Sequence, residues 1–269
     1  MSESARFQED VSQNVLTVLS QAVDEGRIAG GVVLVALNGV VVAEEAAGYE
    51  NIALAIPMHI NARFRLASVT KPIVSLAALK LVHLGILDLH EPITNWLPYF
   101  RPRLADGRQP KITLHHLLSH SSGLSYGFQE AAGSEYERFR VSDGLDCSGL
   151  TLAENLRRLG NAKLKFEPGA AWQYSLGLDV VGAIIECATE STLPDAIDDL
   201  ICRPLGLNSL AFAAKAQREL AVPYIDSLGT LAEMPEPAEV VPPDSGIAIR
   251  FSPRRAHAPN EFPSGEPEW

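Results

Sequence analysis

The strongest constraint on the fold is the dipeptide Asn38-Gly39, which stands between two apolar runs at residues 31–37 and 40–47. Both residue types tolerate positive φ, so this pair between β-rich runs predicts a tight antiparallel hairpin. The first run shows little alternation of apolar and polar residues, which indicates that both faces of its strand are covered. A two-stranded hairpin cannot provide that cover alone, so further elements must pack against it.

The rest of the chain is predicted to be mainly helical up to about residue 220. Apolar residues at helical spacing predict a helix over residues 5–25 that ends near Gly26. The same criteria predict helices over residues 69–84, 114–120, 152–159, 177–189 and 194–202. Nine of the 18 prolines lie in the last 49 residues, where they exclude long regular elements. Strands and helices together indicate a mixed α/β (α+β) fold.

Charge and composition exclude several classes of partner. The chain has 33 acidic and 22 basic residues, a net charge of −11, whereas nucleic acids and acidic membranes require a basic face. The most apolar stretch, residues 28–43, is too short to span a bilayer, and no secretory signal is visible at the N-terminus. Cys147, Cys187 and Cys202 are too few and too scattered for a disulfide framework or a zinc site. We therefore expect a reduced, cytoplasmic protein.

Ser68 and Lys71 are the most suggestive pair for chemistry. Residues three apart share a helix face, so the serine Oγ and the lysine Nζ can meet within one turn. A helix N-terminus favours a developing oxyanion and lowers the lysine pKa, which would let the lysine act as general base for a nucleophilic serine. A capping serine beside a solvated lysine is the structural alternative, because about 0.4 Ser-x-x-Lys matches are expected by chance in such a composition.

Further segments follow this pair in a fixed order, at residues 84–98, 112–124, 166–182 and 203–207. Together with Phe64-Arg-Leu-Ala-Ser-Val-Thr-Lys71, they resemble the serine β-lactamase, penicillin-binding protein and family VIII carboxylesterase superfamily. The likeness runs from about residue 28 to 265 and is strongest to the esterase-like branch. It implies a β-lactamase/transpeptidase-like fold, in which a helical subdomain packs against an antiparallel sheet flanked by helices.

The resemblance also implies a role for Tyr174, which matches the family tyrosine that relays protons to the leaving group. It implies neither a metal nor a cofactor. The family motif has an asparagine two residues after the tyrosine, which contacts the lysine and the substrate amide, and here that position is Leu176. Loss of the amide dipole should weaken β-lactam recognition more than ester recognition, so this departure favours an esterase with at most weak β-lactamase activity.

Other chemically suggestive residues have structural interpretations. The Gly-Leu-Ser-Tyr-Gly segment at residues 123–127 fits Gly-x-Ser-x-Gly, but it follows a predicted helix instead of a strand, so we interpret it as a turn. His115, His116 and His120 have no carboxylate at metal-ligand spacing and are interpreted as packing and helix C-terminal residues. Asp179 lies inside an apolar run, where a structural hydrogen bond is expected.

A third family element is missing from the sequence. Relatives carry a Lys/His-Thr/Ser-Gly or Trp-Gly-Gly triad on a strand that supplies the second oxyanion donor, and none occurs in the 95 residues after Tyr174. We therefore expect an incomplete domain whose C-terminal strands are absent. Losing one oxyanion donor typically costs about 10²–10³ in rate. The hairpin would also keep an exposed apolar edge, which favours self-association.

Together, these interpretations predict one function and one domain organisation. We expect a serine hydrolase that acts on small esters or β-lactam-like substrates through an acyl-enzyme, with Ser68 as nucleophile, Lys71 as base and Tyr174 as proton donor. The alternative is a catalytically impaired remnant that acts at most as a binding module. The expected parts of the single incomplete domain are an N-terminal helix and hairpin over residues 1–62, a mainly helical part over residues 63–220, and a proline-rich connector or tail over residues 221–269.

Overall fold

The computed structural model describes residues 3–214, 220–227, 229–241, 248–258 and 262–263. The chain divides into two compact units. One unit comprises residues 1–65 and 215–235, and the other comprises residues 66–214 and 236–269.

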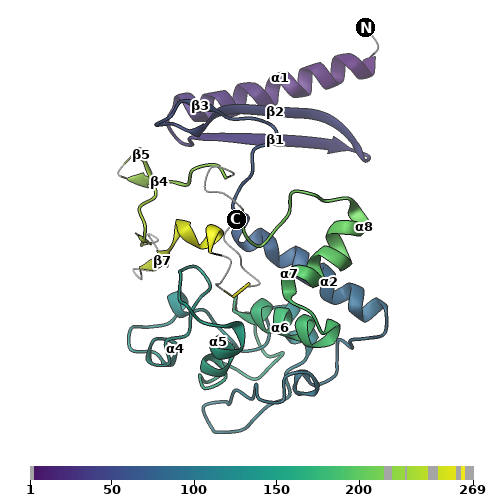
Figure 1. Ribbon diagram of the computed structural model, residues 1–269. Helices are drawn as coiled ribbons and strands as arrows, with labels where there is room; N and C mark the ends of the chain where they lie inside the picture. Colours follow the sequence, from purple (N-terminus) through teal and green to yellow (C-terminus); the bar gives the residue numbers. More distant parts are fainter. Residues whose placement is uncertain (1–2, 215–219, 228, 242–247, 259–261, 264–269) are drawn as a thin grey trace. The chain divides into compact units, whose positions relative to one another are not determined.

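The first unit is a helix on a small antiparallel sheet. Helix α1 (Glu3–Asp24) packs mainly against β2 (Val40–Asn51), which lies between β1 (Gly30–Leu37) and β3 (Ile56–Pro57) (Figure 1). Leu34 and Leu37 of β1 are 56% and 51% exposed. The described residues therefore leave part of the strand surface open, which differs from the expectation that both faces are covered.

The turn between β1 and β2 confirms the predicted hairpin. Leu37 pairs with Val40, and Asn38 and Gly39 have φ angles of +51° and +78°. Two successive residues at positive φ are what a two-residue hairpin loop requires, because this turn matches the right-handed twist of the strands.

The proline-rich region forms two short hairpins, one in each unit. Strands β4 (Tyr224–Ser227) and β5 (Thr230–Glu233) belong to the first unit, where the Tyr224 hydroxyl accepts a 2.8 Å hydrogen bond from the Ile52 N–H. Strands β6 (Ala238–Val240) and β7 (Ile249–Phe251) belong to the second. Each strand has only three or four residues, as expected where prolines remove backbone donors.

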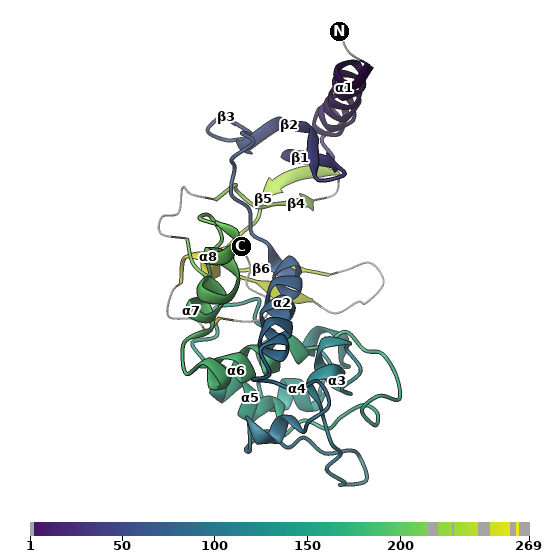
Figure 2. The same cartoon turned by 90° about the vertical axis from the view of Figure 1, so that its right-hand side faces the viewer.

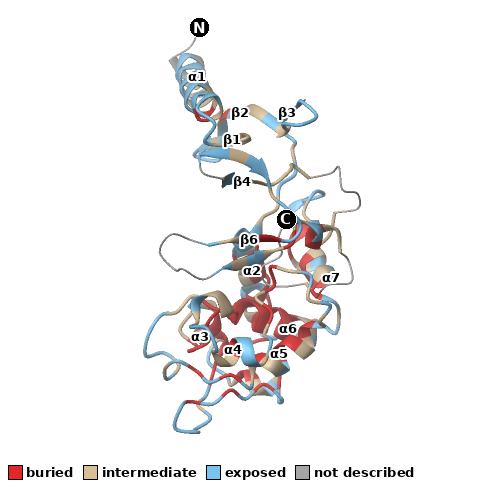
Figure 3. Ribbon diagram, turned by 90° about the vertical axis from the view of Figure 1, so that its left-hand side faces the viewer, coloured by how far each residue is buried: buried red, intermediate tan, exposed pale blue. Residues whose placement is uncertain are grey.

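The second unit is built around α6 (Gly177–Thr189). This helix packs against α2 (Thr70–His83), α3 (Leu114–Leu118), α5 (Leu152–Leu159) and α7 (Leu193–Ile197) (Figure 2). Residues 177–185 of this helix are all buried, and burial is concentrated along α6 and its neighbours (Figure 3). A helix that is buried on every side and mostly apolar is a central core helix. Two shorter α-helices, α4 (Glu135–Arg138) and α8 (Arg203–Leu205), also belong to the described part of this unit.

Local capping accounts for several of these boundaries. Thr113 precedes α3 and accepts a hydrogen bond from the His116 N–H, while the His116 ring accepts one from the Thr113 N–H. This reciprocal pair satisfies two donors at the helix start. The predicted helix over residues 194–202 is α-helical only up to Ile197, the end of α7, and continues as a π-helical segment over Asp198–Cys202.

Within the second unit, the buried Arg255 links the described residue Phe262 to the segment around Asp146. Its guanidinium donates hydrogen bonds to the Asp146 carbonyl at 2.7 Å and to the Phe262 carbonyl at 2.8 Å. A planar guanidinium can serve several acceptors at once, so one side chain joins segments far apart in sequence.

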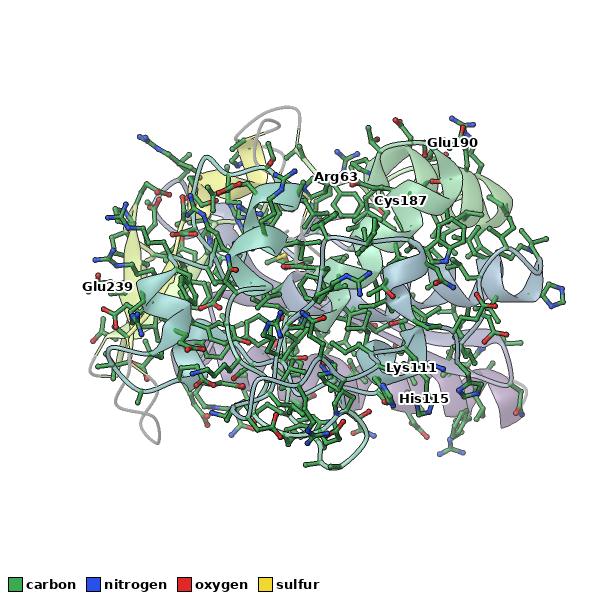
Figure 4. The ribbon with its side chains drawn as sticks, turned by 90° about the horizontal axis from the view of Figure 1, so that it is seen from below. Arg63, Lys111, His115, Cys187, Glu190 and Glu239 are labelled. Atoms are coloured by element: carbon green, nitrogen blue, oxygen red, sulfur yellow. The ribbon has the colours of Figure 1, made fainter. Side chains whose placement is uncertain are left out.

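All three cysteines are free, with Cys147 and Cys187 exposed and Cys202 buried. Cys187 lies near the end of α6, close in sequence to the helix C-cap Glu190 (Figure 4). Among the described residues, no helix is both long enough and apolar enough to cross a membrane.

Candidate active site

The start of α2 brings Ser68 and Lys71 together. Ser68 is exposed in the 3₁₀ turn Ala67–Val69 that leads into the helix, and Lys71 is only 6% exposed in its first turn. The Lys71 Nζ lies 3.3 Å from the Ser68 Oγ. The contact predicted from the Ser-x-x-Lys spacing is therefore present.

The residue before the serine has an unusual backbone conformation. Ala67 has a φ of +43°, in the left-handed region that residues with a Cβ rarely adopt. Such conformations cost on the order of 1–3 kcal/mol and are concentrated at functional sites. Here the strained residue directly precedes the exposed Ser68 hydroxyl.

Tyr174 reaches the same serine from the segment that precedes α6. Its hydroxyl donates a 2.7 Å hydrogen bond to the Ser68 Oγ, and the Lys71 Nζ lies 4.6 Å from the centre of its ring. The three side chains selected from the sequence thus converge on one oxygen atom. A serine hydroxyl contacted by an amine and a phenol can lose a proton to one group and receive one from the other.

Burial adjusts the proton affinities of these groups. Desolvation lowers the pKa of Lys71 to about 7, against an opposing influence from Asp179, which is 1% exposed in the first turn of α6. Burial raises the pKa of Tyr174, and its hydrogen bond with Ser68 works in the opposite direction. Near neutral pH, the lysine is therefore partly unprotonated and able to accept a proton, while the phenol keeps its own.

Asp179 has a larger electrostatic influence than its sequence setting indicated. Its position within an apolar run predicted only a structural hydrogen bond, yet it raises the pKa of Lys71. The carboxylate also lies in the first turn of α6, where the helix dipole favours negative charge.

Tyr126 is a site neighbour that sequence reasoning did not select. It is fully buried, and its ring lies 5.2 Å from the Tyr174 ring and 5.6 Å from the Lys71 Nζ. No local pattern identifies it, because the contact joins segments far apart in the chain. The nearest sequence signal is the glycine-flanked segment 123–127, which contains this tyrosine beside Ser125.

That segment is a buried turn, as its sequence context predicted. Ser125 is 0% exposed, its N–H donates to the Tyr136 hydroxyl at 2.8 Å, and Gly123 has a φ of +83°. A Cβ at Gly123 would lie 2.4 Å from the Phe166 carbonyl oxygen, so this close approach requires glycine. Ser125 is not accessible to a substrate.

The three histidines have different surroundings. His116 belongs to the cap of α3, and His115 is exposed with its ring 5.7 Å from that of His90. His120 instead packs its ring 4.8 Å from the Tyr174 ring. Within the described ranges, no group of three or more metal-binding side chains occurs.

Leu176 occupies the position at which the family motif has an asparagine. Its side chain is 0% exposed and belongs to the hydrophobic core. Leu176 therefore contributes packing at the start of α6, and it offers no amide dipole.

A helical unit that directs serine, buried lysine and tyrosine side chains at one oxygen is the arrangement of a Ser-x-x-Lys site. The family model described as Beta-lactamase matches residues 15–249, and the chain belongs to this family. This confirms the resemblance inferred from the motifs.

Individual relatives agree with the family assignment. Esterase EstB of Burkholderia gladioli is 48% identical over 249 residues, which cover 92% of this chain and 64% of EstB. The solved structure of EstCE1, a hydrolase with promiscuous acyltransferase activity, has a TM-score of 0.93 at 37% identity and covers 99% of this chain and 70% of its own. The fold is thus β-lactamase/transpeptidase-like, and the chain spans less than two thirds of the length of EstB.

A more distant relative is named for acyl transfer. Monacolin J acid methylbutanoyltransferase of Aspergillus terreus is 31% identical over 177 residues, which are 61% of this chain and 41% of the transferase. Proteins similar to this chain are thus named both as esterases and as acyltransferases.

Proposed function

We propose that this protein is a serine hydrolase that cleaves small carboxylic esters through an acyl-enzyme. The observation that carries the proposal is the convergence of the Lys71 Nζ and the Tyr174 hydroxyl on the Ser68 Oγ, at 3.3 and 2.7 Å. The similarity to EstB, named as an esterase, and to EstCE1, named as a hydrolase, supports it.

In the proposed acylation, neutral Lys71 takes the Ser68 proton while the Oγ attacks the ester carbonyl carbon. The tetrahedral oxyanion forms at the N-terminal end of α2, where the helix dipole favours negative charge. As the bond to the leaving oxygen breaks, Tyr174 donates its proton to the departing alkoxide, and the proton held by Lys71 then restores the phenol. Water hydrolyses the acyl-enzyme in the second half-reaction, releasing the acid and regenerating Ser68.

The alternative is a non-catalytic remnant that serves only as a binding module. The low pKa of Lys71 argues for the hydrolase, because a base poised near neutral pH is what proton abstraction requires. A β-lactam-like compound is the secondary substrate class in this proposal.

Fluorophosphonate labelling with peptide mapping tests the nucleophile. We expect one adduct, on Ser68, and we expect Ser68→Ala to lose the adduct and to lower p-nitrophenyl acetate turnover by at least about 10³-fold, because no acyl-enzyme can form. Ser125→Ala is the matched control and should keep the label, since Ser125 is buried. An adduct on Ser125, or on no serine of a folded sample, would rule out this assignment. Nitrocefin assayed in parallel measures any β-lactamase activity.

The proposal treats both compact units as parts of one catalytic domain, because the family match spans residues 15–249 across them. It also places the protein in the cytoplasm. The three free cysteines support a reducing compartment.

We further propose that the β1–β2 hairpin mediates self-association. In the described sheet, β1 is an edge strand, and Leu34 and Val40 are 56% and 59% exposed. Unpaired edges with apolar neighbours favour pairing with another chain. Analytical ultracentrifugation should show a concentration-dependent dimer that Leu34→Glu converts to monomer, whereas Gln13→Glu on the exposed side of α1 should not. A wild-type protein that is monomeric at all concentrations contradicts this proposal.

A further inference from the structure

We propose that His120 is a positioning residue, which holds Tyr174 in the geometry needed to give its proton to the leaving group. This inference rests on the proposed function, because it assigns a partner to one of the groups in the proposed reaction.

The geometry around Tyr174 carries the inference. The His120 carbonyl accepts a 2.8 Å hydrogen bond from the N–H of Gln173, which precedes the tyrosine. The His120 Nδ1 lies 3.4 Å from the Oγ of Ser175, which follows it. The imidazole and phenol rings themselves are 4.8 Å apart at an interplanar angle of 43°. One histidine thus contacts the tyrosine and both of its chain neighbours.

The backbone of His120 is fixed in a conformation that makes these contacts simultaneous. Its φ is +53°, in the left-handed region, where histidine is one of the few enriched residue types with a Cβ. Its N–H donates to the Leu117 carbonyl at 3.2 Å, and the next residue, Ser121, accepts from the Gly169 N–H at 2.8 Å. A strained turn that is secured at both ends is typical of a residue whose orientation matters to function.

The electrostatic surroundings require this imidazole to be neutral. Lys71 of α2 faces it, and burial together with that lysine lowers the pKa of His120 to about 4. The other ionisable groups of the cluster are Tyr174 and Tyr126, on the segments packed against it, and Asp179 of α6, which acts on Lys71 and Tyr126. A neutral His120 ring covers the Tyr174 phenol and adds no positive charge. A charged ring would make it harder for Lys71 to accept the serine proton.

The inference predicts a dependence on the leaving group. An ethoxide leaving group is strongly basic and needs a proton as it departs, whereas p-nitrophenolate departs without one. A displaced Tyr174 therefore slows cleavage of ethyl acetate more than cleavage of p-nitrophenyl acetate. A histidine with a purely structural role would affect both esters equally.

Two variants distinguish the contribution of the His120 ring, which contacts Tyr174, from that of its Nδ1 contact with Ser175. His120→Asn tolerates the left-handed backbone and retains a polar group for Ser175, but it loses the ring contact, whereas His120→Phe keeps a ring against Tyr174. We expect His120→Asn to lower kcat/KM for ethyl acetate by about 10–100-fold and to change that for p-nitrophenyl acetate little. His120→Phe should recover part of the loss. His115→Asn, the same change at an exposed histidine of α3, is the control and should leave both values unchanged.

A pH profile provides a second readout. Removal of the ring exposes Tyr174 to water and weakens the desolvation that raises its pKa, so the basic limb of kcat/KM for ethyl acetate should move to lower pH in His120→Asn. Circular dichroism and the rate of Ser68 labelling by a fluorophosphonate report whether each variant is folded and keeps its nucleophile.

The outcomes distinguish the two proposals. Equal losses on both esters, no loss on either, or loss of folding in both variants would overturn the role of His120 while leaving the hydrolase intact. A folded wild-type protein that labels on no serine and cleaves neither ester would instead overturn the proposed function, and the role of His120 with it. A selective loss on ethyl acetate with retained Ser68 labelling supports both.

Discussion

Lys71→Arg and Lys71→Met are each expected to lower kcat/KM for p-nitrophenyl acetate by about 10²–10⁴-fold, the usual contribution of a general base. Arginine stays protonated at any working pH, and methionine has no group that accepts a proton, although both preserve most of the chain length. Lys80→Met is the control, because Lys80 is exposed near the end of the same helix. Initial rates for the three variants, measured beside fluorophosphonate labelling, test the prediction. Rates for Lys71→Met close to wild type would remove the lysine from the mechanism.

The same lysine sets an expected pH dependence. Because its pKa is about 7 and the neutral form is the active base, kcat/KM should fall about tenfold per pH unit below that value and level off above it. Asp179 raises the pKa of Lys71, so Asp179→Asn should shift this acid limb to lower pH. A limb that stays in place in Asp179→Asn would show that the carboxylate does not act on the lysine.

Leu176→Asn is expected to destabilise the protein by about 3–5 kcal/mol. The leucine is completely buried, so the change forfeits about 1.5–3 kcal/mol of apolar burial and places an amide in the core at a further cost of about 1–3 kcal/mol. For a domain of this size, the loss corresponds to a Tm lower by roughly 6–20 °C. Thermal unfolding followed by circular dichroism measures it.

Leu176→Met provides the matched control, because a volume-conserving apolar exchange costs less than about 1.5 kcal/mol. The structure further predicts that Leu176→Asn gains no nitrocefin hydrolysis, since this side chain lies in the core. A variant that is as stable as wild type and acquires β-lactamase activity would show instead that the amide at position 176 reaches the substrate.

Features set by neighbouring residues were predictable from the sequence. The Asn38-Gly39 turn follows from the φ preferences of two adjacent residues, and the meeting of Ser68 and Lys71 follows from the pitch of one helix. Tyr174 was found only through the family motif, because no local rule places a tyrosine against a serine more than a hundred residues earlier.

Features created by long-range packing were not predictable. The approach of His120 and Tyr126 to the Tyr174 ring depends on how the loops before α4 and α6 pack together, and nothing in their own spacing encodes it. Asp179 looked structural because its neighbours are apolar, and its influence on Lys71 arises only when α2 and α6 meet. Short strands such as β6 and β7 lack the length over which alternation becomes visible.

The left-handed backbone conformation of Ala67, the residue before Ser68, affects how mutations could change the stability and reactivity of this protein. Glycine at position 67 would relax the backbone and raise stability, since it adopts φ of +43° without a Cβ conflict. The same relaxation would widen the range of orientations open to the Ser68 hydroxyl. Thermostability and the proposed reactivity are therefore expected to be opposed at this residue, and a screen for heat resistance alone would select against the geometry that the proposed reaction needs.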